Sequence, residues 1–187
     1  MKKLLLFVML ALVAGSAFAA TGWYSDYIIN SVNGGADEYY WIGTDPSWGT
    51  QFAGSVFNIT LGQTFEFGAD MRYWSDTQDR QGGAFYWQID TGTATEQIWT
   101  QAALGGNDFQ GTLPSTTVDV ASGLGVGSYA INVWAKSWGS GQGDDWLNNA
   151  SANYTATLNV NPVPEPATMS LLGLGALVMA LRRKMSK

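Results

Sequence analysis

Residues 63–70 read QTFEFGAD, and this stretch decides the class of fold that we expect. Its apolar residues Phe65, Phe67 and Ala69 recur at every second position, with small or polar residues between them. A period of two places alternate side chains on opposite faces of an extended chain, so the stretch is typical of a strand with one buried face.

The same alternation continues along the chain. Four clear examples are SVFNITL at 55–61, AFYWQID at 84–90, SYAINVWAK at 128–136 and NYTATLNV at 153–160. Weaker examples lie at 23–30, 38–42, 95–100 and 117–120, and turns rich in Gly, Asn and Asp separate the segments. We therefore expect an all-β fold, a single antiparallel β-sandwich or jelly-roll-like domain, with one short helix at 97–104.

The N-terminus has the parts of a secretory signal peptide. Two lysines precede an apolar run at 4–15, and Ala17 and Ala19 form an A-x-A site, so cleavage is expected after Ala19 or Ala20. The apolar run is shorter than the ~20 residues that a membrane span requires, which disfavours an uncleaved anchor. Sec-type export machinery and a signal peptidase are the expected partners.

The composition excludes several classes of function. The chain has no Cys and no His, which removes disulfides, the common nucleophile pairs and most zinc sites. Between residues 20 and 163 there are three basic and fourteen acidic residues, a net charge of −11. So acidic a domain repels nucleic acid and anionic lipid. We expect a non-enzyme without a cofactor.

Several tryptophans suggest a ligand site. Trp74, Trp138 and Trp146 are predicted in or beside loops, and Asp144 lies close to two of them. Flat rings beside carboxylates suit the apolar faces and hydroxyl rims of sugars. The alternative is that these rings form core and loop anchors.

Two acidic runs offer a weaker hypothesis, a calcium site. Asp76 with Asp79, and Asp144 with Asp145, provide the oxygen ligands that Ca²⁺ prefers. Neither run has the spacing of an EF-hand, so solvated loop acids are the simpler interpretation. A carboxylate pair such as Asp76 and Asp79 is also the minimum for a glycan-active enzyme, the least favoured of the alternatives.

The C-terminal segment, residues 162–187, differs from the rest of the chain. The apolar stretch 167–181 would span roughly 22 Å as a helix, which is short of the ~30 Å hydrocarbon core. Arg182, Arg183 and Lys184 follow it and would stop transfer on the cytoplasmic side. The sequence thus predicts a short transmembrane helix at 167–181 with a basic tail at 182–187.

A four-residue motif precedes this helix. Val163, Pro164, Glu165 and Pro166, followed by an apolar helix and an Arg-rich end, closely resemble the PEP-CTERM sorting signal of Gram-negative bacteria. The resemblance implies processing at residues 163–166 by an exosortase, an integral-membrane cysteine protease or transpeptidase. It also implies an inner-membrane precursor that later reaches the cell surface or the extracellular space.

The domain between the two ends also resembles the small β-sandwiches that accompany this signal, through TFEFGADMRYW, GGAFYWQID and ANYTATLNV. That resemblance implies no activity.

The expected division is a signal peptide at 1–20, a β-sandwich ectodomain at 21–161 and a sorting signal at 162–187. We expect a non-catalytic structural or adhesive module linked to exopolysaccharide or biofilm. The alternative is a carbohydrate-binding module that contacts extracellular polysaccharide.

Overall fold

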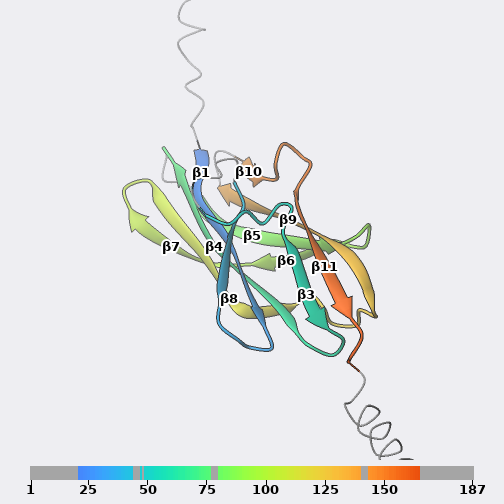
Figure 1. Ribbon diagram of the computed structural model, residues 1–187. Coiled ribbons are helices and arrows are strands. Elements are labelled where there is room, and N and C mark those ends of the chain that lie inside the picture. The colour runs from blue at the N-terminus through green and yellow to red at the C-terminus, as the bar shows by residue number, and fades with distance from the viewer. Residues whose placement is uncertain (1–20, 44–46, 48, 77–79, 140–142, 165–187) are drawn as a thin grey trace, which may run out of the picture.

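The computed structural model describes residues 21–43, 47, 49–76, 80–139 and 143–164 (Figure 1). Within these ranges the chain forms eleven strands and no helix. The predicted signal peptide and the predicted C-terminal helix both lie outside the described residues. In the part of the chain that is described, no helix is long and apolar enough to cross a membrane.

The first sheet has five strands in the order β2-β1-β4-β8-β7, and every neighbouring pair is antiparallel. These strands are β1 (Thr21–Val32), β2 (Glu38–Trp41), β4 (Phe65–Ser75), β7 (Thr100–Gly105) and β8 (Asp108–Asp119). Residues 65–70 of the stretch 63–70 thus form the start of β4, the central strand of this sheet.

The second sheet has the order β3-β11-β9-β5-β6, and β10 pairs with the C-terminal half of β9. Its strands are β3 (Val56–Thr60), β5 (Arg80–Ile89), β6 (Thr95–Ile98), β9 (Gly127–Gly139), β10 (Gly143–Leu147) and β11 (Tyr154–Asn161). The pair of β3 and β11 is parallel, and the other pairs are antiparallel.

The two sheets face each other over one hydrophobic core (Figure 1). Aromatic rings join them directly. The Phe57 ring of β3 lies 5.0 Å from that of Phe65 in β4, and the rings of Phe67 in β4 and Phe85 in β5 are 6.3 Å apart. The residues predicted to face the core in β4 and β11 are all buried. The all-β, mainly antiparallel class is therefore confirmed, while the jelly-roll form stays a prediction.

One local prediction is wrong. Residues 97–104 are not helical, because they belong to the end of β6 and most of β7. Trp99 lies between these strands with 4 % exposure, at the point where the chain passes from the second sheet to the first. β6 pairs with β5, and β7 pairs with β8. The backbone N–H and C=O groups of this segment therefore bond to neighbouring strands rather than to one another in a helix.

Candidate functional site

The outer face of the second sheet carries an unusual set of side chains along β9. The inward-facing residues Ile131, Val133 and Ala135 are fully buried. The residues between them alternate to the outer face, so Trp134 and Lys136 point away from the core and remain partly exposed.

The neighbouring strands add to this row through their register. Tyr86 of β5 pairs with Trp134, while on the other side of β9 Trp146 pairs with Lys136 and Asp144 pairs with Trp138. Cross-strand partners share a face, so these side chains gather on one surface. We call this surface the aromatic platform, and its members are Tyr86, Trp134, Lys136, Trp138, Asp144 and Trp146.

The rings of the platform contact one another. Tyr86 and Trp134 are stacked with centroids 5.5 Å apart and planes 2° apart, and Tyr86 and Trp146 have centroids 6.0 Å apart. Trp146 keeps 45 % of its surface exposed, although large apolar side chains are usually covered. The platform thus offers contiguous aromatic area to solvent.

Lys136 lies at the centre of the platform. Its Nζ is 5.1 Å from the ring centroid of Trp146, 5.4 Å from that of Trp138 and 5.9 Å from that of Tyr86. It also forms an ion pair with Asp144, with 3.5 Å between Nζ and Oδ2. Burial alone would lower the pKa of Lys136, but hydrogen bonding to the Tyr86 hydroxyl and the charge of Asp144 raise it, so the side chain stays an ammonium.

The Tyr86 hydroxyl connects the platform to β6. It donates a hydrogen bond to Oε1 of Glu96, the residue that pairs with Tyr86 across the two strands. Burial and this bond both raise the pKa of Tyr86, which keeps the phenol protonated at neutral pH. The platform therefore combines apolar ring surface with fixed donors and acceptors, the combination that orients a polyhydroxylated ligand.

The sequence predicted a ligand site made of three tryptophans and Asp144, and the structure brings three of these four residues together. Trp138, Asp144 and Trp146 share the platform, but they lie in strands rather than in loops. Trp74 belongs to β4 in the other sheet, where its ring covers Gly22 so closely that a Cβ there would lie 2.6 Å from Nε1. Trp74 therefore packs as part of the first sheet and is separate from the platform.

The calcium candidates are more scattered. Asp144 belongs to the outer face of β10, while Oδ2 of the adjacent Asp145 is buried, as alternation along a strand requires. Asp76 is exposed just after β4, and Asp79 lies outside the described residues. Among the described residues, no group of three or more acidic side chains is arranged to hold a metal ion.

Sequence reasoning missed Tyr86, Trp134, Lys136 and Glu96. The sequence did contain a signal for two of them. Tyr86 and Trp134 occupy positions that the alternation places on the solvent face of a strand, where side chains are usually polar. Aromatic residues in the outward register of two strands would have indicated the platform. Which strands pair could not be known from the alternation itself.

The remaining predicted site residues belong to the two ends of the chain. Asn161 ends β11, and Pro162, Val163 and Pro164 follow as exposed chain outside both sheets. Of the other residues singled out at the ends, none falls in the described ranges: Ala17, Ala19, Ala20, Glu165, Pro166, Arg182, Arg183 and Lys184.

Residues 162–184 match the family model of the PEP-CTERM protein-sorting motif. The chain thus carries this signal at its C-terminus, beginning one residue after the last strand. Such a signal marks an exported protein that an exosortase processes from a membrane-anchored precursor. No curated protein matches the chain.

Proposed function

We propose that this carrier of a PEP-CTERM sorting signal is an inner-membrane precursor of a Gram-negative bacterium, cut by an exosortase at Pro164-Glu165-Pro166. The ectodomain is then released or re-anchored at the cell surface, where it is a non-catalytic adhesive component of an exopolysaccharide matrix. The observation that carries this proposal is the match to the sorting motif at 162–184.

The position of the motif supports processing in the folded state. Pro162 and Pro164 lie beyond the sheets, and each disfavours helix and ladder pairing in its neighbours. An extended segment is what proteases bind, and the exposed residues 162–164 can be reached without unfolding β11.

Pulse-chase labelling tests the processing step. In a host that has an exosortase, the exported chain is expected to lose the mass of its tail, while in a matched host without the enzyme it keeps that mass. Glu165→Gln tests the carboxylate of the motif in the same assay. Equal masses in both hosts would show that the segment is a plain anchor.

A second function, carbohydrate binding, is favoured by the aromatic platform. Its rings supply stacking area, and Lys136, Asp144 and Glu96 supply hydrogen-bonding groups around them. The charges of these three groups sum to −1, and the whole ectodomain is strongly acidic. A neutral polysaccharide therefore suits the platform better than an acidic one.

A glycan array with the purified chain tests this second function. Trp146→Ala and Trp138→Ala are expected to weaken specific binding by about ten-fold or more, because aromatic anchors contribute most of the energy at such surfaces. Tyr39→Ala is the matched control, since Tyr39 is an exposed ring, at 52 %, on the other sheet. Binding that survives both tryptophan variants would exclude the platform.

A further inference from the structure

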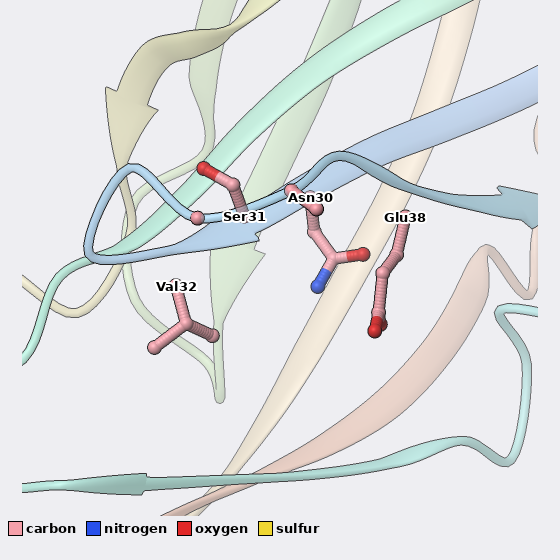
Figure 2. A pocket seen from close by; sticks show the side chains of 6 residues that line it. Asn30, Ser31, Val32 and Glu38 are labelled. Carbon is pink, nitrogen blue, oxygen red and sulfur yellow. The ribbon is translucent and has the colours of Figure 1, made fainter.

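A cavity lies between the two sheets at the edge formed by β2 and β3. Two adjoining hollows of about 250 and 310 Å³ make up this space, and Asn30, Val32 and Glu38 line both. Figure 2 shows the smaller hollow, with the amide of Asn30 and the carboxylate of Glu38 pointing the same way into it. We call the combined space the edge cavity. It is separate from the aromatic platform, which lies on an outer face.

Asn30 is the feature that points to a ligand. It lies on β1 with 2 % exposure, and among the described residues its Oδ1 has no hydrogen-bond partner. A buried carbonyl oxygen without a donor costs free energy. A donor that enters the edge cavity would remove that cost.

Glu38 stands beside Asn30 because the two residues are cross-strand partners of β1 and β2. One of its carboxylate oxygens, Oε2, accepts a hydrogen bond of 3.0 Å from the Tyr40 hydroxyl. Burial and this carboxylate raise the pKa of Tyr40, so the phenol stays neutral at physiological pH. The carboxylate itself is at the exposed rim and keeps free accepting capacity.

The opposite wall of the cavity is mainly apolar. Phe57 and Ile59 of β3 and Phe65 of β4 are all buried, and the Phe57 ring meets that of Tyr40 edge to face at 5.0 Å. The accessible apolar lining in front of these buried residues comes from Val56, at 58 % exposure, and the partly exposed Tyr40. A ligand therefore meets acceptors on one side and hydrocarbon on the other.

The charge of the cavity selects the ligand further. No Lys or Arg is among the residues that line the two hollows, and Glu38 supplies a negative charge. The surrounding domain, at −11, adds an attractive field for cations.

We propose that the edge cavity binds a primary ammonium group carried on a small ring with an apolar face, as in an amino sugar with a free amine. The ammonium donates to the Glu38 carboxylate and to Oδ1 of Asn30, and the ring packs against the accessible side chains of Tyr40 and Val56. The larger hollow, at about 310 Å³, is at the lower end of the ~300–1,000 Å³ that is typical of ligand pockets, and it fits one such sugar unit.

The same ammonium chemistry has a second source, an ethanolamine lipid headgroup. Ile59, which lines the cavity, pairs with Val160 near the end of β11, so the cavity is close to the start of the sorting signal. The test therefore includes both sources.

The full chain, kept in a neutral detergent, is titrated with glucosamine, glucose, N-acetylglucosamine and ethanolamine, and binding is followed by ligand-observed NMR. Saturable binding is expected for glucosamine and not for glucose or N-acetylglucosamine, which lack the charge. Tighter binding of glucosamine than of ethanolamine assigns the site to sugars. If ethanolamine binds as tightly as glucosamine, the site still binds an ammonium group, but the ligand is assigned to a lipid headgroup.

Glu38→Gln is expected to weaken glucosamine binding by about ten-fold to a hundred-fold, because it removes a charge-assisted hydrogen bond. Asp37→Asn is the matched control. Asp37 is the residue before Glu38, carries the same charge and is exposed, but it does not line the cavity. Equal binding of glucose and glucosamine, no binding of either amine, or equal affinities of the two variants would overturn the proposal. Trp146→Ala leaves glucosamine binding intact, which separates this site from the platform.

Discussion

At the scale of single residues, Asp26 is the clearest case in which the structure departs from simple alternation. The register between β1 and β4 shifts between Trp23 and Ser25, so the strand contains a β-bulge. One extra residue reverses which positions face the core. Trp23 packs against Tyr73, and after the bulge it is Asp26 and Ile28 that point inward. A period of two could not predict a buried carboxyl there.

The environment of Asp26 raises its pKa well above the usual value. Burial, at 1 % exposure, is the main cause, and the hydrogen bond from the Arg72 amide to Oδ1 opposes it. The folded state therefore keeps a proton that the unfolded chain releases above about pH 4. The contribution of Asp26 to stability is therefore fully present below that pH and is lost as the pH rises through the elevated pKa.

Asp26→Asn is expected to stabilise the protein at neutral pH. The amide keeps an oxygen for the Arg72 amide and carries no charge, so the gain is about 1.4 kcal/mol for each unit by which the pKa is raised. Urea unfolding from pH 4 to pH 8 measures this, and the advantage should vanish near pH 4. Asp37→Asn, an exposed acid, is the control. A constant difference at every pH would contradict the titration of Asp26.

At the scale of elements, the crossing from β6 to β7 depends on close packing around Trp99. A Cβ on Gly83 would lie 2.0 Å from the Trp99 ring, and one on Gly111 would lie 2.3 Å from it. The ring thus occupies space that two glycines on different sheets leave open. The sequence predicted a helix here because its residues are reasonable helix formers, and the strand state results from tertiary contacts that no local pattern reports.

Gly83→Ala is expected to lower the free energy of unfolding by about 1–3 kcal/mol, because the methyl group overpacks a site where the Trp99 ring and the Lys136 carbonyl leave no room. Gly125→Ala is the control, since its nearest atom would be 3.9 Å away and a change within about 0.5 kcal/mol is expected. Urea midpoints followed by tryptophan fluorescence compare the two. Equal midpoints would show that Trp99 moves aside without cost.

At the scale of the whole molecule, the sequence predicted the class of fold and the start of the sorting signal, but not the arrangement of strands. The alternating segments at 55–61, 84–90, 128–136 and 153–160 all correspond to strands of one sheet. Their spatial order depends on long-range pairing, such as the parallel pair of β3 with β11, about a hundred residues apart. The platform was only partly predictable for the same reason.

The position of β11 sets a limit on where the chain can be cut. This strand lies between β3 and β9, and its residues Tyr154, Ala156, Leu158 and Val160 are each at most 4 % exposed. At about 1.5–3 kcal/mol for each buried large side chain, their loss approaches the 5–15 kcal/mol that stabilises a typical domain. Removal of β11 would also leave the backbone of β3 without its neighbour in the sheet, and one edge of β9 unpaired over residues 127–133.

A chain that ends after Pro164 is therefore expected to unfold cooperatively, with a Tm within a few degrees of that of the full-length protein. A chain that ends after Asn153 is expected to show no cooperative transition, because β3 loses its neighbour in the sheet and four core positions are empty. Circular dichroism during heating compares them. A folded shorter chain would mean that β11 is dispensable, and a cut upstream of Pro162 would then be compatible with a folded product.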